Sequence, residues 1–180
     1  MFNLDSKTVL ITGAASGIGE AIAYVLSSAG TRDVVADVNC PDGERVAQRC
    51  AMTRQSAHFI PLDVTDEGSC IAMADAVQSQ HGALDILINN AGIGHVGTIQ
   101  ATDGTDLDRL YAVNVRGVFN VTKAFIGEML RRRVGVIVNI ASISGVLAIR
   151  DRGERVVSGV AYRHYRHYKR SGDFPGPIRE

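Results

Sequence analysis

The chain has 180 residues, of which 46% are hydrophobic and 21% charged, and these values are typical of a globular protein with one buried core. Its formal net charge is zero, with a slight acidic excess in residues 1–150 and a basic excess in residues 151–180. No stretch approaches the roughly 20 continuous apolar residues of a membrane-spanning helix, and the N-terminus lacks the layout of a signal peptide. We therefore expect a cytoplasmic protein that makes no membrane contact.

Apolar runs alternate with segments of helical periodicity along the first 142 residues. The runs at 7–13, 33–38, 58–64, 84–92 and 135–142 predict five strands. The segments at 17–29, 41–55, 66–81 and 104–132 predict the helices between them. Because apolar strands need cover on both faces and parallel strands need crossover connections, the sequence predicts a doubly wound α/β fold with a parallel sheet.

The three cysteines, Cys40, Cys50 and Cys70, match neither the spacing of a metal site nor a redox CxxC motif. We expect reduced thiols without a function and no bound metal. The histidine in GIGHVGTI, His95, is interpreted as an exposed loop residue, with a side chain that faces a binding pocket as the alternative.

The segment TGAASGIG at 12–19 lies between the first predicted strand and the first predicted helix. Glycines in such a turn let the backbone approach a pyrophosphate, and the helix N-terminus adds N–H donors and a positive dipole end. The glycine spacing is GxxxGxG rather than GxGxxG, and a glycine-rich turn alone is a weak signal. The interpretation therefore depends on the strand predicted before the turn and the helix predicted after it. The predicted cofactor-binding residues of this loop are Gly13, Ser16, Gly17, Ile18 and Gly19.

Asp37 ends the second predicted strand, 18 positions after Gly19. A carboxylate there can accept hydrogen bonds from the ribose diol of an adenosine, and it would repel a 2′-phosphate. Ser16 offers no cation for such a phosphate, and Arg32 precedes the second strand rather than ending it. The sequence therefore favours NAD over NADP.

The glycine loop, the Asp-Val pair after the third predicted strand and NNAG at 89–92 together make the chain resemble the short-chain dehydrogenase/reductase family over about residues 5–152. The resemblance implies a Rossmann-type doubly wound parallel sheet, truncated here after about five strands. It places residues 1–152 in an NAD-binding Rossmann domain and leaves 153–180 as an irregular basic tail. Further cofactor-binding roles are implied for Asp63 and Val64, near the adenine, and for Asn90, Ala91 and Gly92, along the cofactor.

Members of this family transfer a hydride between nicotinamide and a carbonyl or alcohol carbon, with an Asn, a Ser and a Tyr-xxx-Lys pair around the reacting oxygen. The resemblance implies that Asn114 in YAVNVRG supports a proton-relay water and that Ser142 in NIASISG hydrogen-bonds the substrate oxygen. The Tyr and Lys carry the acid/base step, because a phenol with a pKa of ~10 needs a nearby ammonium to ionise. Their positions fall on Arg155 and Gly159 here, and neither residue can do this chemistry.

A Tyr-xxx-Lys spacing does occur at Tyr165 and Lys169, within AYRHYRHYKR and 23 residues after Ser142. We take this pair as the candidate substitute for the family's acid/base pair. The alternative is a chance spacing, because three of the five tyrosines fall in this segment.

The sequence thus predicts an NAD-dependent oxidoreductase for a small secondary alcohol or ketone, and whether this chain turns over stays open. The alternative is a non-catalytic nucleotide-binding remnant or an interaction module. A methyltransferase could use Asp37 to hold the ribose of S-adenosylmethionine, but it leaves NNAG and Ser142 unused.

No nucleic-acid partner is expected, because the arginines at 131–133 end a helix and complement its dipole. The apolar side of the helix at 104–132 would permit a homo-oligomer.

The apolar periodicity stops near residue 152, and an Arg-rich segment follows. We interpret residues 153–180 as the out-of-frame product of a frameshift near codon 153, with a genuine shortened homologue as the alternative. Resequencing the coding DNA and translating all three frames tests this. With a frameshift, another frame encodes Tyr and Lys where this chain has Arg155 and Gly159, followed by further strands and helices. If no frame restores that pattern, the frameshift hypothesis is wrong.

Overall fold

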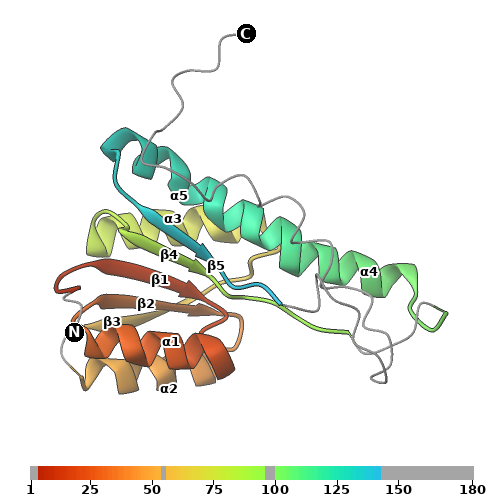
Figure 1. The fold of residues 1–180 in the computed structure, drawn as a ribbon, viewed down its shortest axis with the longest axis horizontal. Helices are drawn as coiled ribbons and strands as arrows, with labels where there is room; N and C mark the ends of the chain where they lie inside the picture. Colours follow the sequence, from red (N-terminus) through yellow and green to blue (C-terminus); the bar gives the residue numbers. More distant parts are fainter. Residues whose placement is uncertain (1–3, 54–55, 96–99, 143–180) are drawn as a thin grey trace, which may run out of the picture.

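A parallel five-stranded sheet with the strand order β3-β2-β1-β4-β5 forms the centre of the computed structural model, which describes residues 4–53, 56–95 and 100–142 (Figure 1). The strands are β1 (Thr8–Thr12), β2 (Arg32–Asp37), β3 (Ala57–Pro61), β4 (Ile86–Asn89) and β5 (Val136–Asn139). The helices are α1 (Gly17–Ser28), α2 (Cys40–Ala51), α3 (Glu67–His81), α4 (Gly104–Tyr111), the π-helical turn η1 (Ala112–Gly117) and α5 (Val118–Arg132). The order equals the first five places of the doubly wound order 3-2-1-4-5-6, so the predicted Rossmann-type fold is confirmed.

The helices form one layer on each face of the sheet. Helices α1 and α2 cover one face, and α3 and α5 cover the other (Figure 1). The chain changes sides after β3, when α3 carries it back across the sheet to β4 beside β1. The connections from β1 and β4 therefore leave in opposite directions, which makes the β1/β4 boundary the switch point of the sheet.

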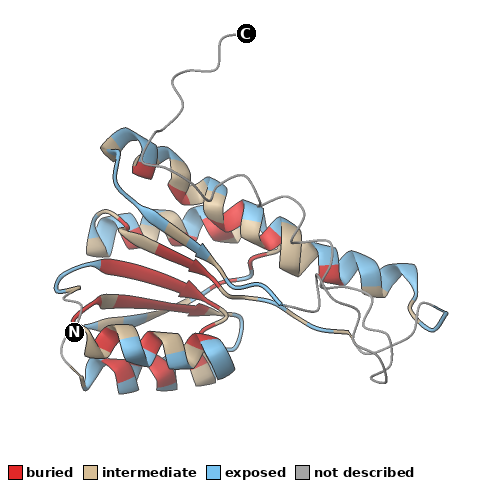
Figure 2. Ribbon diagram, in the orientation of Figure 1, coloured by how far each residue is buried: buried red, intermediate tan, exposed pale blue. Residues whose placement is uncertain are grey.

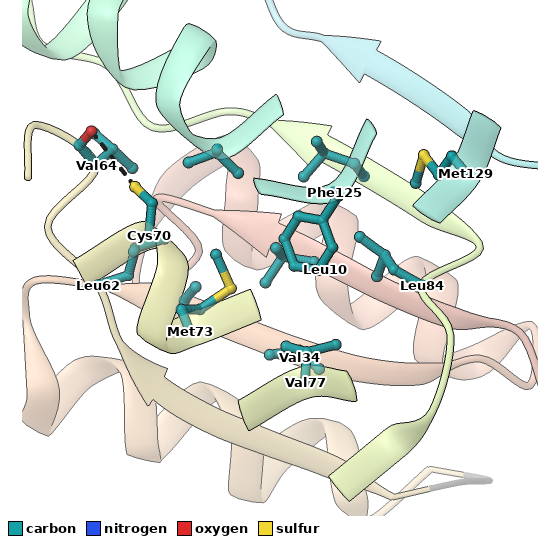
Figure 3. Packing of buried hydrophobic residues seen from close by; sticks show 13 residues of the cluster. Leu10, Val34, Leu62, Val64, Cys70, Met73, Val77, Leu84, Phe125 and Met129 are labelled. Carbon is teal, nitrogen blue, oxygen red and sulfur yellow. Dashed lines mark hydrogen bonds between the residues drawn. The ribbon is translucent and has the colours of Figure 1, made fainter. Parts of the chain in front are cut away.

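The larger hydrophobic core lies between the sheet and the α3/α5 layer. Phe125 of α5 and Met73 of α3 pack over Leu10 and Val34, on adjacent strands, and all four are buried (Figure 3). Burying a side chain of this size contributes about 1.5–3 kcal/mol. Strands β1 and β2 are buried along nearly their whole length (Figure 2), as expected for central strands covered on both faces.

The helix predicted over 104–132 is present but not uniform, because the π-helical turn η1 separates α4 from α5. Gly117 ends this turn against the β3–α3 connection, where a Cβ atom would lie 2.7 Å from Cγ2 of Val64. Asn114 lies within the turn and bonds to the main chain after β4. π-helical turns inside α-helices are frequent at functional sites.

The predicted apolar stripe of α1 is less buried than the sequence indicates. Ile18 and Val25 of α1 are 64% and 65% exposed, because the small residues Gly19, Ala23 and Ser27 face the sheet instead. Exposed apolar residues also occur on α4, α5 and the edge strand β5: Leu107, Tyr111, Phe119, Leu130, Val136 and Val138. Within the described ranges, no helix combines the length and apolar character needed to cross a bilayer.

The cysteines lie on α2 and α3, and two of them are in the core. Cys50 and Cys70 are buried and Cys40 is partly buried, and all three are free. Burial raises the pKa of the Cys50 and Cys70 thiols to about 11. Both thiols therefore stay protonated at neutral pH, which suppresses nucleophilic reactivity.

Asp33 is a carboxyl group inside the core, at the start of β2, with 1% of its surface exposed. Burial raises its pKa to about 7, against the smaller lowering effects of the Thr31 and Ser27 hydroxyls. An aspartate in the unfolded chain has a pKa of about 3.9. Between about pH 4 and 7, Asp33 is therefore protonated in the folded chain and ionised in the unfolded chain. The stability that the folded chain gains by holding this proton is complete below this pH window and is lost as the pH rises through it.

We expect Asp33→Asn to become more stable relative to the parent chain as the pH rises from 5 to 8, by an amount on the order of a few kcal/mol, since each pKa unit corresponds to ~1.4 kcal/mol. Urea denaturation across this range measures the difference. Asp75→Asn, which removes a carboxyl group on the exposed side of α3 rather than in the core, is the matched control. An Asp33→Asn difference that does not change with pH would contradict the argument.

Candidate functional site

The loops that follow the strands meet at one edge of the sheet, because all strands run in the same direction. At the switch point, the glycine loop (12–19, from the end of β1 to the first turn of α1) lies beside residues 90–92 after β4, and Asp37 at the end of β2 lies on its other side. Ligands of doubly wound sheets bind in the crevice outside these carboxyl ends. This edge therefore brings the glycine loop, Asp37 and the NNAG segment together.

Two glycines allow the β1–α1 loop to pack directly on the segment after β4. Gly13 has a positive φ of 64°, and a Cβ atom there would lie 2.6 Å from Cα of Ala91. A Cβ atom on Gly19 would overlap the Gly13 carbonyl oxygen and come within 2.5 Å of the Asn90 side-chain nitrogen. A side chain at either position would push the two loops apart.

The third loop glycine leaves open space. Gly17 has a φ of 57°, and no atom lies within 4 Å of the position a Cβ would take. Its neighbours Ser16, the N-cap residue of α1, and Ile18 are exposed, and the Ser16 hydroxyl makes no capping hydrogen bond. The N-terminus of α1 is therefore accessible to an anionic group, which its N–H groups and dipole would favour.

Thr12 and Asn90 connect the two loops through four hydrogen bonds. The Thr12 hydroxyl oxygen accepts from the main-chain N–H groups of Asn90 and Ala91, at 3.1 and 3.0 Å. In return, the Asn90 side-chain nitrogen donates to the carbonyl oxygens of Thr12 and Gly13, at 3.0 and 2.9 Å. Sequence analysis did not assign Thr12 a role, although its hydroxyl ends β1 directly before the glycine loop.

Asp37 holds the glycine loop from the β2 side. Its carboxylate accepts from the Ala15 N–H at 3.0 Å and from the Asn39 N–H at 2.9 Å. A carboxylate offers about four acceptor positions, so two remain for further donors such as a diol.

A group of charged residues that sequence analysis missed lies on the other side of Ala15. Arg45 of α2 donates to the Ala15 carbonyl oxygen at 3.2 Å and to Glu20 of α1 at 2.9 Å. Arg49 donates to the same Glu20 oxygen at 3.1 Å. The hydrogen bond from Arg45 is the main cause that lowers the pKa of Glu20. In the sequence, this group of charged residues could have been found from Arg45 and Arg49, which are four residues apart on one face of a helix.

Asn114 anchors the chain just beyond the NNAG segment. Its side chain pairs with the main chain of Ile93 at both ends, since Oδ1 accepts from the N–H and Nδ2 donates to the carbonyl oxygen, each at 2.9 Å. Gly92 is close to it, because a Cβ atom there would lie 3.3 Å from the Asn114 Oδ1. The π-helical turn thus points this amide at the site edge of the sheet.

His95 differs from its predicted state as an exposed loop residue. Only 17% of its side chain is exposed. Its Nε2 lies 3.0 Å from the Thr102 hydroxyl and its Nδ1 lies 3.7 Å from Asp106. The ring therefore connects the segment after β4 to the start of α4.

Asp63 and Val64 follow β3, two strands away from β1. Asp63 accepts from the N–H and hydroxyl of Thr65, at 2.9 and 2.7 Å, and so shapes the β3–α3 turn. Val64 is buried, and its carbonyl oxygen accepts from the Asn120 side chain at 3.0 Å and from the thiol of Cys70 (Figure 3). Both residues lie at the carboxyl edge, and Val64 also belongs to the core.

Ser142 lies at the same edge, three residues beyond the end of β5, and is exposed. The strand before it is fixed to β4 by the side chain of Asn89, which donates to the Asn139 side chain at 2.8 Å. Tyr165 and Lys169, like the whole segment 153–180, lie outside the described residues. Among the described residues, no group of three or more His, Cys, Asp or Glu side chains is placed to hold a metal ion.

Comparisons with known proteins agree with this geometry. A family model for short chain dehydrogenases matches residues 7–152. The D-threitol dehydrogenase of Mycolicibacterium smegmatis is 37% identical over 148 residues, which are 82% of this chain and 57% of that protein. The chain thus spans little more than half the length of this curated relative.

Two solved structures extend the comparison. A short chain dehydrogenase/reductase from Burkholderia phymatum in complex with NAD has a TM-score of 0.82 at 31% identity, covering 89% of this chain and 57% of that one. A metagenomic short-chain oxidoreductase in complex with NADP has a TM-score of 0.77 at 31% identity, covering 88% and 69%. Relatives of both cofactor types are therefore similar to this chain. The glycine loop, Asp37, Asn90 and Asn114 all fall within the matched residues, and the chain belongs to the short chain dehydrogenases.

Proposed function

We propose that this chain binds NAD and serves an oxidoreductase that interconverts a small secondary alcohol and the corresponding ketone. In this proposal residues 1–152 form the NAD-binding domain and residues 153–180 a basic tail. The single observation that carries it is the glycine cradle, in which Gly13 and Gly19 pack on the loop after β4 while Gly17 leaves the N-terminus of α1 open. A pyrophosphate fits such an opening, because close backbone approach and helix N–H donors are what it requires.

The preference for NAD over NADP rests on Asp37. Its carboxylate is fixed by the Ala15 and Asn39 N–H groups and keeps acceptor capacity for the 2′- and 3′-hydroxyls of an adenosine ribose. A 2′-phosphate at the same place would meet a negative charge. In the same arrangement Asp63 and Val64 would lie near the adenine, and Asn90, Ala91 and Gly92 along the cofactor.

The catalytic roles extend from the same edge. When bound, the nicotinamide supplies the chemistry of hydride transfer. Ser142 would hydrogen-bond the substrate oxygen, and Asn114 would hold the segment after β4 and support a proton-relay water. Tyr165 would act as acid or base with Lys169 lowering its pKa, if these two reach the site.

A small alcohol or ketone is the proposed substrate class, in keeping with the D-threitol dehydrogenase among the relatives. The exposed apolar residues of α4 and α5, such as Leu107 and Phe119, would allow a homo-oligomer through the helix at 104–132. A cytoplasmic location stays a prediction. The second candidate function is a non-catalytic nucleotide-binding remnant, which NADH binding without turnover of any alcohol or ketone would favour.

Gly19→Ala tests the cradle directly. The added Cβ overlaps the Gly13 carbonyl oxygen, so the loop must shift, and we expect NADH to bind at least about tenfold more weakly, which corresponds to ~1.4 kcal/mol. NADH fluorescence titration measures the dissociation constant, and circular dichroism checks that the variant is folded.

Gly127→Ala is the matched control. Gly127 lies on the exposed side of α5 with no atom within 4 Å of its Cβ position, so alanine there should stabilise the helix by about 0.5–1 kcal/mol and leave NADH binding unchanged. Failure of the parent chain to bind NADH, or an unchanged affinity in folded Gly19→Ala, would contradict the proposed function.

A further inference from the structure

Ala15 is held on both sides by charged groups of opposite sign. Its N–H donates to Asp37, and its carbonyl oxygen accepts from Arg45. The Arg45 guanidinium therefore lies at the same end of the glycine loop as the carboxylate proposed to meet the adenosine ribose. A second guanidinium, that of Arg49, is connected to the first through Glu20.

Both guanidinium groups bond to Glu20. Arg45 donates through Nη1 to Glu20, through Nε to Asp42 at 3.3 Å and through Nη2 to Ala15. Arg49 donates to Glu20 and lies 5.3 Å from the ring centre of Tyr24. Glu20 is the less exposed partner, with 23% of its side chain accessible, so it is the fixed point on which the two arginines converge.

The charges around this end of the loop sum to a small negative value. Glu20 and Asp42 bond to the guanidinium groups of Arg45 and Arg49, and a third carboxylate, Asp37, bonds to the N–H of Ala15. A phosphate monoester carries up to two negative charges and is bound best by bidentate arginine. The two arginines could supply this recognition, but their donors are engaged by carboxylates of the chain itself.

We propose that Glu20 is a second determinant of cofactor choice: by binding Arg45 and Arg49 it withholds from the 2′-phosphate of NADP the guanidinium group of Arg45, which lies beside Ala15, and that of Arg49, which is connected to it. The inference rests on the proposed nucleotide-binding function and extends it beyond Asp37. Asp37 repels the phosphate, and Glu20 removes the cations that would compensate for that repulsion. Cofactor choice is then set by a helix α1 residue as well as by the end of β2.

The test is a titration of NADH and NADPH by their own fluorescence, with the ratio of the two dissociation constants as the measured quantity. A merely structural role of Glu20 would weaken both cofactors alike and leave this ratio unchanged. In the Asp37→Ala chain, where the direct repulsion is gone, we expect Glu20→Gln to shift the ratio towards NADPH by about tenfold or more. Adding Arg45→Ala should remove most of this gain.

Glu128→Gln in the Asp37→Ala chain is the matched control, because it also neutralises a glutamate beside an arginine. That arginine, Arg132, bonds to Leu84 and Asp85 just before β4, at the amino end of the strands. Glu128→Gln should leave the ratio unchanged. The inference is overturned if Glu20→Gln does not shift the ratio of the two dissociation constants, or if the shift towards NADPH persists after Arg45→Ala. In either case, NADH binding by the parent chain still supports the proposed function. Absence of binding of either nucleotide to the parent chain overturns both.

Discussion

The close packing of the β1–α1 loop on the segment after β4 is the constraint on which the site depends. A Cβ atom on Gly13 would overlap the main chain of Ala91 across this contact, and one on Gly19 would overlap the Gly13 carbonyl oxygen and the Asn90 side chain. Thr12 and Asn90 join the two loops with four hydrogen bonds. Such hydrogen bonds contribute about 0.5–1.5 kcal/mol each in net terms. Their larger effect is geometric, because they fix the position of the α1 N-terminus relative to β4.

Other elements are positioned relative to this contact. Asp37 of β2 holds Ala15. Because the strand order is β2-β1-β4, Asp37, the glycine loop and the segment after β4 follow one another along the carboxyl edge of the sheet. Asn114 fixes Ile93 from the π-helical turn, which places α4 and α5 relative to the same segment. The Asn89 side chain bonds to Asn139 and so joins β4 to the end of β5, three residues before Ser142.

The electrostatics of the glycine loop follow from helix packing. Helices α1 and α2 lie side by side on one face of the sheet, which brings Glu20 of α1 next to Arg45 and Arg49 of α2 (Figure 1). Exposed ion pairs of this kind add little stability, with a median of about 0–1 kcal/mol. Because Arg45 also bonds to Ala15, these pairs matter for the proposed cofactor choice more than for folding.

The sequence by itself determined the element order, the parallel sheet, the glycine loop and the family, because these depend on local patterns: apolar periodicity, a glycine turn between strand and helix, and NNAG after a strand. It also identified Asp37 as the carboxylate that ends β2. Only the tertiary structure decided which residues meet across distant segments. The Thr12–Asn90 bonds span 78 positions and the Arg45–Glu20 pair spans 25, and no local pattern encodes such contacts.

Burial was likewise decided in three dimensions. Periodicity marks Ile18 and Val25 as apolar but cannot tell that Gly19, Ala23 and Ser27 allow α1 to pack closely on the sheet with another face. The π-helical turn at Asn114 and the partly buried His95 follow from contacts between the helix and the segment after β4. These features depend on the packing of elements against one another, which a sequence read along its length does not contain.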